Sequence, residues 1–242
     1  MSQVKKRSNT ASKRSDDKKN IILLSYPRSG NTAVRYFLEF VSGMASMGYG
    51  NKLDQPIIHK NLINSNHKII KTHGNISASR WDKDRHQMSI SSNLLIFLIR
   101  DPIECITRHY ETKINSPVSG KIDNYFFENF FQFKKATCKK EIFYYEDMIK
   151  KPSFFYKRLG DFINADKNLV QEFLDNLKEH AKKSFSFYIN SDEQQANLDN
   201  FSHLQLNRHR KKYSKEEIDD FFNYLRDQLG SSYSYLQRYY TD

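Results

Sequence analysis

The feature that most constrains the fold is an uninterrupted apolar run, Leu-Leu-Ile-Phe-Leu-Ile, at residues 94–99. A strand that is apolar on both faces must be covered on both faces, which is typical of central strands in a parallel sheet. A bilayer span needs roughly 20 apolar residues, so the run predicts a buried strand over 93–99 and not a transmembrane segment. We therefore expect a sheet that lies between two layers of helices.

Strands and helices alternate along the first 150 residues. The run 21–26 predicts another buried strand, and apolar residues at helical spacing follow it and end near Gly43. Further short strands are predicted at 68–71 and 142–145, and a helix with proline in its first turn is predicted over 103–113. This alternation predicts a three-layer α/β/α fold with a central parallel sheet, of the P-loop-like nucleotide-binding type.

The last third of the chain has a helical pattern. Apolar residues recur at helical spacing between Phe155 and Leu177, and Ser214 with Glu217 forms a capping-box pattern for a later helix. A chain of 242 residues is long enough for one ordinary domain. We assign residues 20–242 to a single domain.

Positive charge is concentrated ahead of this domain. The chain carries 39 Lys and Arg against 28 Asp and Glu, a net charge of +11. Residues 1–19 hold seven basic and two acidic side chains among polar ones, so we expect a disordered basic tail there. Two further basic clusters, at 134–140 and 208–212, indicate either solvated surface or a site for an anion, such as a phosphorylated small molecule or nucleic acid.

Composition also excludes several classes of protein. The two cysteines, Cys105 and Cys138, cannot build a disulfide framework or a four-cysteine zinc site, and no metal site is expected. The basic N-terminal residues are not followed by an apolar stretch, so no secretory signal is expected. In the absence of other signals we expect a reducing compartment and a cytoplasmic location.

The segment Tyr26-Pro-Arg-Ser-Gly-Asn-Thr32, between the first strand and helix, has the composition of an anion-binding loop. Backbone amides and the positive end of the helix dipole favour an anion at this point. Gly30 permits close backbone approach, and Arg28 brings a permanent forked cation. Three neighbouring side chains can donate to phosphate oxygens: Ser29, Asn31 and Thr32. The Lys-Ser/Thr pair of the nucleoside-triphosphate loop is missing, and an ordinary strand-to-helix turn stays open as the alternative.

This loop resembles the 5′-phosphosulfate-binding loop of sulfotransferases that use 3′-phosphoadenosine 5′-phosphosulfate (PAPS). Family members carry Tyr-Pro-Lys/Arg-Ser-Gly-Asn/Thr-Thr between a strand and a helix. Three later segments resemble the family in the same order: Lys71-Thr72-His73, Phe97-Leu-Ile-Arg-Asp-Pro102 and Tyr144-Tyr-Glu-Asp-Met148. The four segments span residues 20 to about 165, and they imply a sulfotransferase domain of the histidine-base type.

The resemblance implies a role for each matching residue near the transferred group. Arg28 would contact the 5′-phosphosulfate and neutralise charge on the leaving oxygen, while residues 29–32 would cradle the phosphate. His73 would be the general base for an acceptor hydroxyl. Lys71 would stabilise the transferring group.

Other matching residues would bind the rest of PAPS. Arg100, at the end of a central strand, would bind the 3′-phosphate. Arg108 stands where the family usually has a serine for the same phosphate, and Thr107 is an alternative to it. Tyr145 would approach the adenosine, with packing in the core as an equally weighted alternative.

The chain departs from the family pattern at several positions. Ala33 stands where many members have a tryptophan near the adenine, and Gly74 follows the histidine where cytosolic members have Leu-Pro. The C-terminal basic, glycine-rich loop of the family is not recognisable. Arg210 and Lys211 lie in about the same place with the same charge, and we expect them to contact PAPS.

The sequence thus predicts metal-independent transfer of a sulfuryl group from PAPS to a hydroxyl of a small-molecule or glycan acceptor. Catalysis would rest on positioning and electrostatics. Three alternatives stay open: a nucleotide kinase or related phosphotransferase, a basic nucleotide- or nucleic-acid-binding protein, and a domain that binds PAPS without turnover. No recognised nucleic-acid motif is present, so no specific nucleic-acid partner is expected. The acceptor and the oligomeric state are not determined by the sequence.

Overall fold

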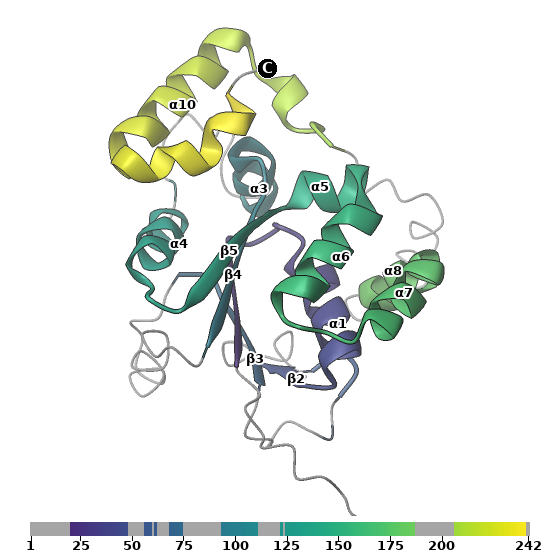
Figure 1. Cartoon of the computed structure of the whole chain (residues 1–242). Coiled ribbons are helices and arrows are strands. Elements are labelled where there is room, and N and C mark those ends of the chain that lie inside the picture. Colours follow the sequence, from purple (N-terminus) through teal and green to yellow (C-terminus); the bar gives the residue numbers. More distant parts are fainter. Residues whose placement is uncertain are drawn as a thin grey trace, which may run out of the picture.

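Figure 1 shows the computed structural model of the chain. The structure describes residues 20–47, 56–59, 61, 68–74, 93–110, 122, 124–186 and 206–240. The basic tail predicted for residues 1–19 lies outside the described residues.

Five parallel strands form the central sheet, in the order β2-β3-β1-β4-β5 (Figure 1). Their bounds are β1 Ile21–Ser25, β2 Ala45–Met47, β3 Lys68–Thr72, β4 Leu94–Ile99 and β5 Lys139–Tyr144. The predicted strands at 21–26, 68–71 and 93–99 are confirmed to within one residue. β2 lies in a stretch that the sequence analysis left without a strand, and β5 begins three residues before the predicted 142–145.

Helices cover both faces of this sheet. The α-helices are α1 Asn31–Ser42, α3 Pro102–His109, α4 Asn124–Lys135, α5 Tyr145–Lys150, α6 Pro152–Phe162, α7 Lys167–Asp175, α8 Leu177–Ser186 and α10 Lys215–Leu229. Two 3-10 helices, η4 Arg210–Lys212 and η5 Gly230–Tyr239, flank α10. Figure 1 shows α1, α6, α7 and α8 on one side of the sheet, and α4 and α10 on the other.

Alternate strand residues divide between two hydrophobic cores. Leu23 belongs to the core that contains Phe37 of α1, whereas its neighbour Leu24 belongs to the core that contains Phe130 of α4. Every residue of β4 is buried, as its continuous apolar sequence predicts. Full burial of one Leu or Phe side chain contributes roughly 1.5–3 kcal/mol, so the two cores hold the three layers together. The predicted three-layer α/β/α fold is confirmed.

Helix ends follow the local signals in the sequence. Gly43 ends α1 in the left-handed conformation, and Ser214 and Glu217 make both hydrogen bonds of the capping box at the start of α10. The helix predicted over 103–113 begins one residue earlier, at Pro102, and ends at His109 with Tyr110 as its C-cap, so its predicted end was four residues too late.

Two lysines of the basic cluster at 134–140 serve the fold. The Nζ of Lys140 donates to three carbonyls at the carboxyl end of α4. The Nζ of Lys139 donates to the carbonyl of Phe162 at the end of α6. Cations satisfy the last carbonyls of a helix and complement its dipole. These two side chains therefore stabilise helix ends and are not poised to bind an anion.

Candidate functional site

The site residues predicted from the sequence follow the carboxyl ends of four strands. The loop 26–30 follows β1, His73 follows β3, Arg100 follows β4 and Tyr145 follows β5. Because all pairings are parallel, these strand ends meet at one edge of the sheet. Open α/β sheets bind ligands at this edge. The topology therefore brings together segments that are far apart in the sequence.

The loop after β1 has an unusual backbone. Arg28 and Gly30 both adopt positive φ angles, 67° and 85°. A Cβ at position 30 would lie 2.6 Å from Cδ2 of Tyr145, so only glycine fits there. Gly30 is also the N-cap of α1, and no side chain among the described residues caps the first amides of this helix. Those amides are thus available to an anion.

Two side chains of the loop suit an anionic ligand. Arg28 is exposed, whereas Ser29 is buried, with 1% of its surface accessible. The Oγ of Ser29 has no hydrogen-bond partner among the described residues. An unpaired buried hydroxyl costs about 1–3 kcal/mol, so a ligand that pairs with it gains that free energy.

Arg100 holds the loop through a hydrogen bond to its backbone. Its Nη1 donates to the carbonyl oxygen of Arg28 at 2.9 Å, and its Cζ lies 4.3 Å from the ring centroid of Tyr145. The Nη2 atom lies 3.6 Å from Oε2 of Glu104, and both side chains are buried. Arg100 therefore fixes the backbone of the loop, and its expected contact with a 3′-phosphate stays a prediction.

Tyr145 is a packing residue beneath the loop. Only 3% of its surface is exposed, and its ring fills the space beside Gly30. Burial raises the pKa of its hydroxyl, and the positive charges of Arg100 and Arg108 act in the opposite direction. Of the two readings of Tyr145, core packing is the one that these contacts support. Its approach to adenosine stays a prediction.

His73 is oriented by the backbone of β1. Its Nδ1 lies 2.6 Å from the carbonyl oxygen of Ser25. A carbonyl only accepts hydrogen bonds, so Nδ1 carries the proton and Nε2 holds the lone pair of the neutral ring. This tautomer is the one that a general base requires at Nε2. Lys71, two residues earlier, is half-buried in β3 beside Leu23 of β1.

Gly74 accounts for one departure from the sulfotransferase pattern. Its φ is +90°, and a Cβ there would lie 2.6 Å from the backbone oxygen of Tyr125 in α4. The chain that leaves His73 therefore packs closely against α4. A leucine at position 74 would not fit this approach.

Two polar side chains beside Gly74 were not predicted from the sequence as site residues. Asn129 of α4 is completely buried, and neither of its amide atoms has a hydrogen-bond partner among the described residues. The Nε2 of Gln132 donates to the carbonyl of Gly74 at 2.7 Å, and its Oε1 likewise lacks a partner in the described part of the chain. The available signal was an Asn on the phenylalanine-lined face of α4. Both side chains therefore lie beside the residue that follows His73.

The remaining predicted ligands lie around α3 and η4. Arg108 is half-buried in the last turn of α3, and the Thr107 hydroxyl lies 3.2 Å from that of Tyr213. The guanidinium of Arg210 points to Asp101, with Nη1 3.0 Å from Oδ2. Lys211 is exposed on η4. The expected contacts of these residues with PAPS stay predictions, and Arg210 already has a protein partner.

The buried carboxyl of Asp101 has an unusual ionisation. Burial raises its pKa to about 6, Arg210 opposes this shift, and the nearby Glu146 carboxylate adds to it. The folded protein thus retains the Asp101 proton to higher pH than the unfolded chain, whose value is 3.8. Asp101 favours the folded state at low pH, and this contribution is lost as the pH rises from about 4 to 6.

We expect this loss to be measurable against an Asp101→Asn variant. The free energy of unfolding of the wild type, relative to that of the variant, should fall by roughly 2–2.5 kcal/mol between pH 4 and pH 7. Urea denaturation of both proteins at several pH values measures the difference. A difference that does not change with pH would contradict the raised pKa.

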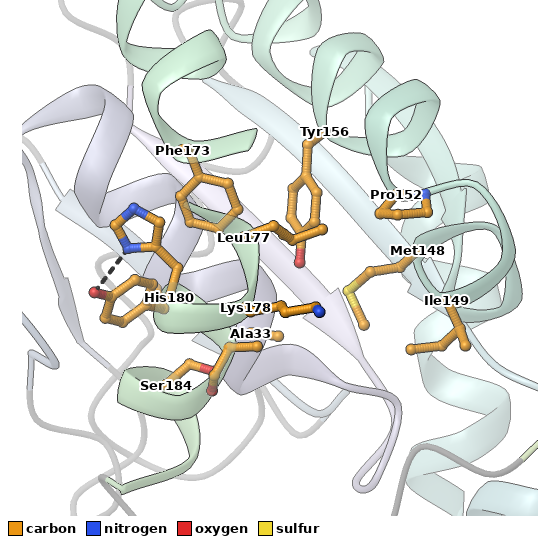
Figure 2. Close-up of a pocket in the computed structure, with 12 residues that line it drawn as sticks. Ala33, Met148, Ile149, Pro152, Tyr156, Phe173, Leu177, Lys178, His180 and Ser184 are labelled. Carbon is orange, nitrogen blue, oxygen red and sulfur yellow. Dashed lines mark hydrogen bonds between the residues drawn. The ribbon is translucent and has the colours of Figure 1, made fainter. Parts of the chain in front are cut away.

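An apolar cavity of about 180 Å³ adjoins the loop (Figure 2). Its lining comes from α1 and from helices α5 to α8: Ala33, Tyr36, Met148, Ile149, Pro152, Tyr156, Phe173, Leu177, Lys178, His180, Ala181 and Ser184. Ala33 lies in the first turn of α1, and Met148 also borders Gly30. A protein cavity of about 150 Å³ holds one benzene molecule. The size and lining therefore suit a flat aromatic ring close to the loop.

His180 and Phe173 form a rigid wall of this cavity. Their rings are stacked, with centroids 4.5 Å apart, and the Tyr36 hydroxyl lies 3.2 Å from Nδ1 of His180 (Figure 2). Burial lowers the pKa of His180, which favours the neutral ring. This cavity could not be predicted from the sequence, because its lining is assembled from five helices.

Comparisons with known proteins identify the fold. No protein-family model and no curated protein matches the sequence. Among solved structures, mouse sulfotransferase SULT7A1 in complex with PAP is similar, with a TM-score of 0.61 and 15% sequence identity. The match covers 92% of this chain and 88% of that chain. The chain therefore has the fold of that sulfotransferase, and the predicted P-loop-like architecture is confirmed.

Two searches of the described residues gave negative results. No described helix is both long enough and apolar enough to cross a membrane. The described residues contain no group of three or more His, Cys, Asp or Glu side chains that could hold a metal ion.

Proposed function

We propose that this chain binds PAPS and transfers its sulfuryl group to a hydroxyl of an acceptor. The observation that carries the proposal is a single juxtaposition at one sheet edge. An anion-binding loop, a cavity of the size of an aromatic ring and a histidine in the tautomer of a base lie around the end of β1. The PAP complex of the structurally similar mouse sulfotransferase supports the same ligand class.

The residues present fit such a donor. The first amides of α1, the unpaired hydroxyl of Ser29 and the exposed Arg28 would hold the 5′-phosphosulfate. The cavity beside Ala33 would receive the adenine. Several smaller apolar side chains of its lining would then make the contacts that a tryptophan makes in other family members. Arg108, whose positive charge opposes the upward pKa shift of Tyr145, would attract the 3′-phosphate.

The donor supplies a sulfuryl group, whose bond to the acceptor oxygen forms as its bond to the phosphate oxygen breaks. His73 takes the acceptor proton on Nε2, and the Ser25 carbonyl stabilises the resulting imidazolium through Nδ1–H. Lys71 and Arg28 neutralise negative charge that develops on the transferring and leaving groups.

Thermal stabilisation by 3′,5′-adenosine bisphosphate in the presence of EDTA tests the donor site. At a concentration of 100 Kd, binding to the folded state adds about 2.7 kcal/mol, which raises the Tm by roughly 5–10 °C. The Arg28→Ala variant should bind about 10- to 100-fold more weakly, because a charged hydrogen bond is lost. The matched control is Arg226→Ala, at an exposed arginine of α10, which should respond like the wild type.

Other responses would contradict the proposal. Stabilisation by ATP with Mg²⁺, but not by the bisphosphate, would favour the kinase alternative. Equal responses of Arg28→Ala and the wild type would place the ligand elsewhere.

An Ala33→Leu variant tests the adenine cavity separately from the phosphate-binding residues, since leucine keeps α1 helical but fills the cavity. It should weaken binding of the bisphosphate and leave binding of inorganic pyrophosphate unchanged.

A further inference from the structure

The turn that contains η4 is bound to the site by a buried carboxylate. Oε1 of Glu104 accepts hydrogen bonds from the backbone amides of His209, at 2.7 Å, and Arg210, at 2.8 Å. The other oxygen, Oε2, faces the guanidinium of Arg100 at 3.6 Å. Arg100 in turn holds the carbonyl of Arg28. A continuous chain of contacts therefore runs from η4 to residues 26–30, which we call the phosphate loop after its proposed role.

Arg210 completes the attachment with its side chain. Its Nη1 donates to Oδ2 of Asp101 at 3.0 Å, and its Nη2 donates to the carbonyl of Tyr239 at 2.6 Å. The Tyr239 hydroxyl donates to Glu146 at 2.6 Å, and Glu146 accepts from the amide of Asp101 at 3.0 Å. These contacts form a closed ring of four residues, in which Asp101 lies two residues beyond the end of β4. The Arg210 guanidinium is thus occupied inside the protein on both of its outer nitrogens.

The position of Asp101 makes this ring relevant to the loop. Asp101 adjoins Arg100 and caps α3 through its Oδ1, which accepts from the amide of Ile103. A shift of the Asp101 backbone would move Arg100, because the two residues are joined by one peptide bond. Arg28 is held in a left-handed conformation that non-glycine residues seldom adopt, so it depends on the contact from Arg100.

We propose that Glu104 and Arg210 are positioning residues, which couple the η4 turn through Arg100 to the conformation of the phosphate loop. Arg210 then acts through Asp101 and does not touch the nucleotide. The consequence for binding rests on the proposed function, but the effect on the loop itself does not. The inference replaces our expectation that Arg210 is a direct ligand.

Hydrogen exchange of the amides in residues 26–32 tests the inference without any ligand. Arg210→Gln and Glu104→Gln should each accelerate exchange in this loop by about tenfold, a typical size for coupling between connected elements. The control is Asp147→Asn. Asp147 binds Arg238 of η5 through two hydrogen bonds but makes no contact with Arg100 or η4 among those described. This variant should exchange in the loop like the wild type.

Binding of 3′,5′-adenosine bisphosphate then separates a positioning role from a direct one. The Asp101→Asn and Arg210→Gln variants should weaken binding by similar factors, and the double variant should be no weaker than either. If only Arg210→Gln weakened binding, Arg210 would be a direct ligand and the inference would be wrong. The inference would also be wrong if hydrogen exchange in residues 26–32 were unchanged in both Arg210→Gln and Glu104→Gln. If one of these two variants unfolds, the exchange rates of the other decide the result. A wild type that does not bind the bisphosphate would refute the proposed function, and loop exchange would still decide the inference.

Discussion

The His73→Gln variant should lose about two to four orders of magnitude in turnover while it still binds the nucleotide. Glutamine can keep a hydrogen bond to the Ser25 carbonyl, but it cannot accept a proton as imidazole does. The expected loss equals the usual contribution of one general base. Turnover is measured with radiolabelled PAPS and the best acceptor from a panel of phenols and oligosaccharides.

The control for this variant is His59→Gln. The Nε2 of His59 lies 2.9 Å from the backbone oxygen of Glu39, in a contact with the body of α1. We expect it to keep turnover within a factor of a few of the wild type. If His73→Gln were as active as His59→Gln, another group would have to remove the acceptor proton.

The Gly30→Ala variant should lose about 2–5 kcal/mol of stability and most of its nucleotide binding. The left-handed backbone disfavours alanine by about 1–2 kcal/mol, and overpacking against Tyr145 adds about 1–3 kcal/mol. Relief of the clash must move either the Tyr145 ring or the loop. Urea denaturation gives the stability, and calorimetry with 3′,5′-adenosine bisphosphate gives the affinity.

Gly43→Ala isolates the effect of the clash. Gly43 has a similar φ of +66°, but a Cβ there would meet nothing within 4 Å. The variant should lose only about 1–2 kcal/mol of stability and bind the nucleotide normally. Equal losses of affinity in Gly30→Ala and Gly43→Ala would show that tight packing behind the loop is unimportant for binding.

Local and repetitive signals in the sequence were sufficient to predict most of the fold. β4 is apolar throughout because helices cover both of its faces, and Gly43 and Ser214 mark helix ends through contacts within a few residues. β2 has only three residues and no strand-like pattern. β5 was predicted too short because Lys139 and Lys140 resemble a surface cluster, whereas an edge strand accepts lysines readily.

The site was predictable only where its residues follow strand ends. The loop around Gly30 and His73 could be located because each follows a buried strand. The contact between Arg210 and Asp101 could not be predicted, because the two residues are more than a hundred positions apart in the sequence. The cavity beside Ala33 depends on how several helices pack, which no local pattern encodes.

The two outer strands of the sheet also bear on self-association. An open sheet presents unpaired backbone groups at its edges, and a second chain can add a strand there. β2 is short, and β5 begins with Lys139 and Lys140, whose amino groups are fixed on the ends of α6 and α4. Replacing both lysines by valine would remove the hydrogen bonds to the last carbonyls of two helices, and it would also make this strand edge more apolar. We therefore expect the two side chains that stabilise these helix ends also to oppose strand addition at this edge.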